Sequence, residues 1–89
     1  MNSQYIENKL EYLEKIDLRT LQSDRSMEYF SKRVAVIRGG IKSLKGFAYK
    51  NPYSKPGMQT LTLTNDLETR LNKLVKAANS INFNQAENV

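Results

Sequence analysis

One stretch of the chain, from Asp24 to Tyr49, constrains the fold most, because its apolar residues recur with an unbroken helical spacing. The intervals alternate between three and four residues, which places every apolar side chain on one face of an α-helix. Helices that pack along their whole length show this pattern. The spacing therefore predicts a long helix over 24–49 with this face in the core. The face consists of Met27, Phe30, Val34, Ile37, Ile41, Leu44 and Ala48.

The charged residues are divided by position along the chain. The 89 residues carry a net charge of +5, and residues 1–28 hold six acids and four bases. Residues 29–65 hold seven bases and no acid, while residues 66–89 hold three of each. A block of one sign suits a polyanion such as a nucleic acid, and it equally suits a solvated face that keeps a small protein in solution.

Residue types that carry chemistry are scarce. The chain has no cysteine and no histidine, which removes thiolate nucleophiles, the commonest metal ligand and the commonest general base near neutral pH. Glu7, Glu11 and Glu14 share a helical face that can in principle bind a cation, but a solvated acidic face is the commoner role. We therefore expect no enzyme activity, no catalytic or metal site and no cofactor.

Length and hydropathy set further limits. A chain of this size buries only about 60–65% of its unfolded surface, and oligomerisation is a common source of added stability. We expect a homodimer, because the central helix is longer than its predicted neighbours can cover. No apolar run reaches the roughly 20 residues that cross a bilayer, and the first residues lack the pattern of a signal peptide. These observations predict a cytoplasmic protein without membrane association.

Two shorter helices are predicted on either side of the central one, over 3–17 and 65–79, from the same spacing of apolar residues. Thr64 or Asn65 can cap the second of them. The asparagine-rich tail over 80–89 favours helix weakly, so we expect it to be weakly structured. The apolar stripes consist of Ile6, Leu10 and Leu13 in the first helix and Leu67, Leu71, Leu74, Ala78 and Ile81 in the last.

Two adjacent glycines, Gly39 and Gly40, interrupt the central helix in composition but not in phase. Together they cost about 1–2 kcal/mol relative to alanine inside a helix. They can mark a break, allow the close approach of another backbone, or simply be tolerated on an exposed face. The unbroken apolar phase on both sides favours a continuous or only kinked helix.

The segment between the central and last helices is predicted to be irregular and then extended. Residues 50–57 contain two prolines and a glycine, and Pro56-Gly57 is typical of a turn. Residues 59–64 alternate polar and apolar side chains and include three threonines, which favours a strand. We therefore expect a basic Pro/Gly loop and an extended segment over 50–64.

The sequence that begins Gln-Thr-Leu-Thr-Leu-Thr-Asn-Asp-Leu-Glu, over 59–78, resembles the strand and first helix of ribbon-helix-helix DNA-binding proteins. In that family two copies pair their strands into a ribbon that enters the major groove of DNA. The resemblance implies that Thr60 and Thr62 face the bases, and that Leu61 and Leu63 face the core.

The patterns together predict a mainly α fold. Residues 1–89 form a single domain, a small three-helix bundle with one long central helix and a short extended segment before the last helix.

The function expected for such a chain is a small non-enzymatic protein associated with nucleic acid, regulatory or accessory, that binds a polyanion through its basic central helix and loop. The alternative is a protein–protein interaction module, such as an adaptor, an inhibitor or a subunit of a virion, whose basic face docks an acidic partner. Membrane-surface binding is a weaker hypothesis, because it would leave the outer helices without a core. The candidate binding residues are Lys32, Arg33, Arg38, Lys42, Lys45, Lys50, Tyr53, Lys55, Thr60 and Thr62.

Overall fold

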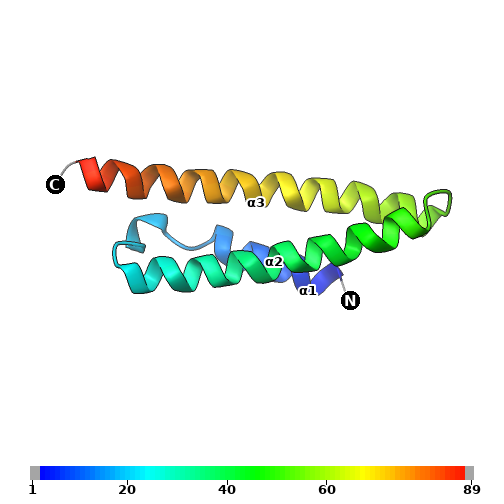
Figure 1. Cartoon of the computed structure of the whole chain (residues 1–89), viewed down its shortest axis with the longest axis horizontal. Helices are drawn as coiled ribbons and strands as arrows, with labels where there is room; N and C mark the ends of the chain where they lie inside the picture. Colours follow the sequence, from blue (N-terminus) through cyan, green and yellow to red (C-terminus); the bar gives the residue numbers. More distant parts are fainter. Residues whose placement is uncertain (1–2, 88–89) are drawn as a thin grey trace.

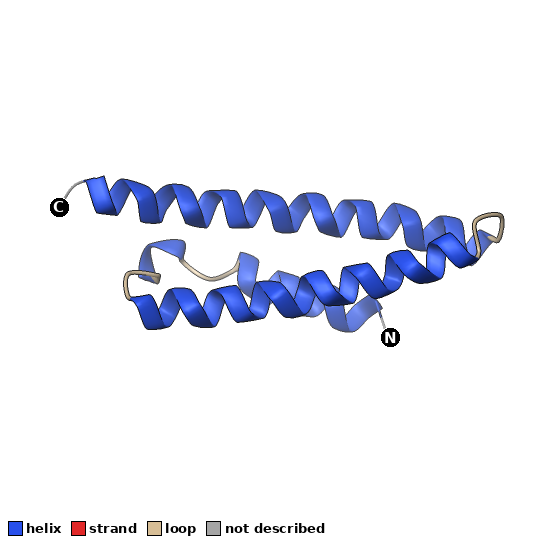
Figure 2. Cartoon of the chain, viewed as in Figure 1, coloured by secondary structure: helices blue, strands red, loops and turns tan. Residues whose placement is uncertain are grey.

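The computed structural model describes residues 3–87, and the surroundings of side chains for residues 3–80. Every regular element in this range is helical, and the α-helices form the predicted three-helix bundle with a long central helix (Figure 1, Figure 2). The bundle is elongated, with extents of 53 × 18 × 18 Å. The elements are α1 (Ser3–Glu14), the 3₁₀ turn η1 (Leu18–Thr20), α2 (Asp24–Lys50) and α3 (Lys55–Glu87).

The three helices differ in length, and this difference determines which of them covers which. The 33-residue α3 runs antiparallel to the 27-residue α2 along its length, whereas the 12-residue α1 covers only part of the pair (Figure 1). The reason to expect a homodimer is a central helix that is too long for its neighbours to cover. Because α3 is longer than predicted and spans α2, that reason no longer holds, and the homodimer itself stays a prediction.

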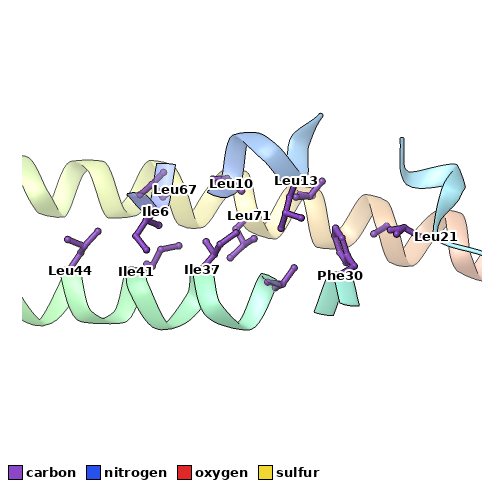
Figure 3. Close-up of a cluster of buried hydrophobic side chains, with 13 residues drawn as sticks. Ile6, Leu10, Leu13, Leu21, Phe30, Ile37, Ile41, Leu44, Leu67 and Leu71 are labelled. Atoms are coloured by element: carbon purple, nitrogen blue, oxygen red, sulfur yellow. The ribbon is translucent and has the colours of Figure 1, made fainter. Parts of the chain in front are cut away.

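The predicted apolar face of α2 forms the middle of the core. Ile37 is fully buried, and Figure 3 shows it and Ile41 directed toward Leu67 and Leu71 of α3. Full burial of one such side chain contributes about 1.5–3 kcal/mol. The predicted stripe of α1 completes the cluster, with Ile6, Leu10 and Leu13 all buried.

The start of α2 and its glycine pair agree with the sequence. Ser23 caps the helix because its hydroxyl accepts a hydrogen bond from the Ser26 N–H at 3.1 Å, and the Ser26 hydroxyl in turn accepts one from the Ser23 N–H at 3.2 Å. The helix continues without interruption through Gly39 and Gly40, so the predicted continuous helix is confirmed. Gly39 lies on the exposed side and Gly40 on the buried side.

The corner after α1 begins earlier than predicted, since that helix ends at Glu14 rather than at 17. Asp17 caps η1 by accepting a hydrogen bond from the Arg19 N–H at 3.0 Å, and its carboxylate also pairs with the Arg19 guanidinium. The hydrogen bond from the Arg19 side chain, and to a smaller extent that from its backbone N–H, holds the pKa of Asp17 below its ordinary value. Leu21, which follows η1, is buried in the core.

The prediction of an extended segment over 59–64 is wrong, and so is the resemblance of 59–78 to ribbon-helix-helix proteins. No strand occurs in residues 3–87, and α3 already includes this segment (Figure 2). Without a strand there is no ribbon, so Thr60 and Thr62 cannot face DNA bases in the manner that the resemblance implied. The last helix therefore begins at Lys55, and neither Thr64 nor Asn65 caps it.

Threonines at core positions explain this error. Thr60 and Thr64 continue the spacing of Leu67, Leu71 and Leu74 toward the N-terminus, and Thr64 is fully buried. The Thr64 hydroxyl donates to the Leu61 carbonyl of its own helix at 2.9 Å, so its polar atom is satisfied in the core. Tertiary packing of this face therefore overrides the strand propensity of threonine.

The predicted loop over 50–57 shrinks to a tight turn, because α2 continues to Lys50 and α3 starts at Lys55. Ser54 accepts a hydrogen bond from the Gly57 N–H at 3.0 Å, which satisfies one of the free amides of the first turn. Pro56 is tolerated there because the first turn needs no N–H from it. At its other end the α3 backbone remains helical to Glu87 rather than 79, and the weak structure expected over 80–89 stays a prediction.

Two glycines give a matched test of this packing. A Cβ at Gly57 would lie 1.9 Å from the Asn51 carbonyl oxygen, whereas a Cβ at Gly39 would meet nothing within 4 Å. Neither glycine has a positive φ. We expect Gly57→Ala to lower the free energy of unfolding by about 1–3 kcal/mol, and Gly39→Ala to raise it by about 0.5–1 kcal/mol. Urea denaturation followed by circular dichroism measures both, and equal effects of the two substitutions would contradict the turn geometry.

Candidate polyanion-binding surface

The basic residues of α2 divide between its two edges and do not form one face. Lys32 and Arg33 lie toward α1, where they line a groove with Lys9. Arg38 and Lys45 lie toward α3, where each contacts an α3 side chain. The two edges therefore carry different sets of cations with different surroundings.

The groove between α1 and α2 has a volume of about 250 Å³. Residues four and then three positions apart share an edge of a helix, so Tyr29, Arg33 and Val36 follow one another along this side of α2. Val36 is 52% exposed although it is apolar. The groove is lined by Lys9, Tyr29, Lys32, Arg33, Val36 and Ile37.

Arg33 connects the two helices through aromatic rings. Its guanidinium carbon lies 4.5 Å from the ring centre of Tyr29 and 5.0 Å from that of Tyr12, which belongs to α1. Its Nη2 also donates a hydrogen bond to the Tyr29 hydroxyl. A cation over an aromatic face contributes about 0.5–1 kcal/mol at exposed sites and more when water is excluded. Arg33 is thus held in place without a carboxylate partner in the described part of the chain.

Two lysines complete the positive lining of this groove. Lys9 Nζ lies 4.7 Å from the ring centre of Tyr5, four residues earlier on α1. Lys32 pairs with Glu28 at 3.4 Å, but both side chains are more than two-thirds exposed, so water screens this ion pair strongly. The groove is therefore lined by three cations, and the one carboxylate paired with them among residues 3–80, Glu28, is only weakly engaged.

The cations on the α3 edge hold helices together. Arg38 Nη1 donates to Asn72 Oδ1 at 3.1 Å, and Lys45 forms an ion pair with Glu68. The hydrogen bond to Glu68 raises the pKa of Lys45 above its ordinary value. Lys42 stands at the same edge and is exposed. Of these three predicted binding residues, two are engaged in contacts between α2 and α3.

The remaining predicted residues lie at the far end of the molecule. Lys50 ends α2, Tyr53 lies in the turn and Lys55 begins α3, at the opposite end from the start of α2 (Figure 1). Tyr53 is 95% exposed. Thr62 is exposed on α3 and donates to the Met58 carbonyl of its own helix at 3.2 Å, while Thr60 borders a separate hollow beside Phe47. The structure therefore does not bring the ten predicted residues into one site.

Sequence reasoning missed Lys9, Tyr12 and Tyr29. Lys9 lies in the acidic N-terminal third, and only the antiparallel packing of α1 on α2 places it beside Lys32 and Arg33. One signal was available, since Tyr29 and Val36 flank Arg33 with the same spacing as the core residues beside them. That second stripe indicates an edge of α2 that carries exposed apolar and aromatic side chains.

One acidic residue of α1, Glu14, stabilises the fold. Glu14 accepts two hydrogen bonds from Arg70 of α3, at 2.5 and 3.2 Å, and this pairing raises the pKa of Arg70 further. Among the described residues, no group of three or more potential ligands could hold a metal ion. Within the same residues, no helix is long and apolar enough to cross a membrane.

Replacing Lys45 or Lys42 with glutamine removes one positive charge in each case. The two substitutions therefore compare the stability contributed by a cation in an ion pair with that of an exposed cation. Lys45→Gln removes the ion pair with Glu68 and should lower the melting temperature near neutral pH, whereas Lys42→Gln should change the stability by less than about 0.5 kcal/mol. Because pairing raises the pKa of Lys45, its contribution is complete below the ordinary value of 10.5 and is lost as the pH rises through the higher folded value. Calorimetry should therefore show that the difference between Lys45→Gln and the unchanged protein disappears well above pH 10.5. A difference that persists there would exclude the ion pair as its cause.

Comparison with known proteins adds no assignment to this geometry, because no protein-family model, no curated protein and no solved structure matches the chain.

Proposed function

We propose that this protein is a small non-enzymatic nucleic-acid-binding protein, regulatory or accessory, that places phosphates on the cations of the α1–α2 groove. One observation carries the proposal. Lys9, Lys32 and Arg33 converge from two helices on a groove that tyrosines border. Side chains of Arg and Lys beside aromatic rings are the combination with which proteins bind nucleic acid strands.

Further cations outside the groove support this proposal. Lys42, Lys50 and Lys55 are exposed, and none of them forms a salt bridge within the residues that the structure describes. No acid lies between Tyr29 and Asn65 in the sequence, so α2 beyond its first turns and the whole turn attract anions. A polymer that spans several phosphates can engage both regions, whereas a small anion cannot.

An acidic protein is the second candidate partner. Val36 and Phe47 are 52% and 45% exposed on α2, and apolar side chains beside cations also suit an acidic helix with an apolar face. The expected homodimer and cytoplasmic location remain predictions alongside either partner. Retention of an acidic protein in place of nucleic acid would support this second function.

A salt titration tests the nucleic-acid function. We expect a labelled oligonucleotide to bind at about 50 mM salt and to lose affinity by 200 mM. The slope of log K against log salt should lie at about −2 to −5 if three to six cations contact phosphates. The double variant Lys9→Gln/Lys32→Gln should reduce the magnitude of this slope by about 1.5.

The control for this titration is Lys73→Gln/Lys76→Gln, which removes the same charge from exposed positions on α3 outside the groove. It should change the slope much less. The function is rejected if no oligonucleotide binds at the lowest salt, or if the two double variants behave alike.

A further inference from the structure

We infer that the α1–α2 groove is built for a single strand of nucleic acid, with bases stacked against Tyr12 and Tyr29 and phosphates on Lys9, Lys32 and Arg33. This inference rests on the proposed function and narrows its ligand to strands whose bases are unpaired. It follows from the size of the groove, the placement of the tyrosine rings and the contacts of Arg33.

The size of the groove is compatible with one unit of a longer ligand. Its volume of about 250 Å³ lies below the roughly 300–1,000 Å³ of sites that enclose a complete small molecule or cofactor. A nucleotide of an extended strand needs to bury only its base or its phosphate at one place. Affinity then comes from repeated contacts along the strand.

The rings are available for stacking. Tyr12 and Tyr29 are each 54% exposed, although the Arg33 guanidinium lies over one side of each ring. Tyr5 has the same exposure and lies under Lys9. Rings and cations therefore alternate from α1 across to α2. A single strand also alternates flat bases with charged phosphates, so its chemistry complements this arrangement.

A duplex would use this surface poorly. Its bases are stacked on one another and present only their edges in the grooves, so a tyrosine ring could not reach a base face. The cations would still attract duplex phosphates, but the rings would add nothing to that binding. The tyrosines therefore distinguish the two forms of nucleic acid, whereas the lysines do not.

Arg33 contributes a cation held between the two rings. Its Nε is buried and has no hydrogen-bond partner in the described part of the chain. Leaving a buried donor unpaired is unfavourable. A phosphate oxygen accepts hydrogen bonds from guanidinium groups with good geometry, and no carboxylate among the described residues forms an ion pair with Arg33.

The test compares fluorescence anisotropy of a labelled single-stranded RNA, a single-stranded DNA of the same sequence and the corresponding DNA duplex, with polyglutamate as a polyanion that has no bases. We expect one or both single strands to bind at least tenfold more tightly than the duplex or polyglutamate. Tyr12→Leu/Tyr29→Leu should weaken single-strand binding by about tenfold or more. Duplex binding should weaken much less than single-strand binding, because the charge of the protein is unaltered.

Two controls separate stacking from other effects. Tyr12→Phe/Tyr29→Phe keeps both rings and should retain single-strand binding, while removing the hydroxyl that accepts from Arg33. Tyr49→Leu changes an exposed tyrosine outside the groove and should have little effect. Circular dichroism establishes that each variant is folded, and NMR of the tyrosine rings should show shifts at Tyr12 and Tyr29 when the strand binds.

The outcomes separate this inference from the proposed function. If the duplex binds as tightly as the single strands, or the leucine variant binds both equally well, the inference is wrong and nucleic-acid binding stands. If polyglutamate binds as tightly as the oligonucleotides, the groove recognises charge alone, and the inference fails. If no nucleic acid binds at low salt, the inference and the proposed function fail together.

Discussion

The apolar contact between α2 and α3 is the interaction on which the rest of this structure depends. Ile37 and Ile41 meet Leu67 and Leu71 in the middle of the bundle, and only this pair of helices is long enough to define its axis. The contact orients α2 so that one of its edges remains beside α1 and the other beside α3. The position of every cation on α2 relative to its neighbours follows from that orientation. The groove thus results from the orientation of α2 about its own axis, which the core contact sets. No separate loop is needed to form it.

The sequence was sufficient for the parts of the fold that residue spacing alone determines. The central helix was predicted over 24–49 and is observed over Asp24–Lys50, because its seam consists of strongly apolar side chains in an unbroken phase. The start of α3 could not be predicted in the same way. Its seam continues through Thr60 and Thr64, residues that usually favour strands and caps. Burial against the other helices decides their conformation, and such burial is a tertiary property that local preference does not contain.

The candidate site was predictable only in part, for a related reason. The charge count identified Lys32 and Arg33, which line the groove, together with Arg38 and Lys45, which contact α3. All four belong to the same basic block, and nothing in their spacing reveals which will find a partner. Lys9 lines the groove and Tyr12 contacts Arg33, both from a segment that is acidic overall, so the composition of the α1 segment conceals their contribution. A binding site shared by two helices becomes visible only when their packing is known.

The two edges of α2 show two ways in which a small protein can hold its cations. An ion pair such as Lys45–Glu68 stabilises the contact between helices, but the carboxylate largely cancels the positive field outside the protein. Arg33 is held instead by the faces of two tyrosines, which attract the guanidinium through their quadrupoles and carry no net charge. Its charge therefore remains effective at the groove while its side chain stays fixed. Because the order of Arg33 is established before any ligand arrives, an anion that binds there need not immobilise a long flexible side chain, and less of its binding free energy is lost to entropy.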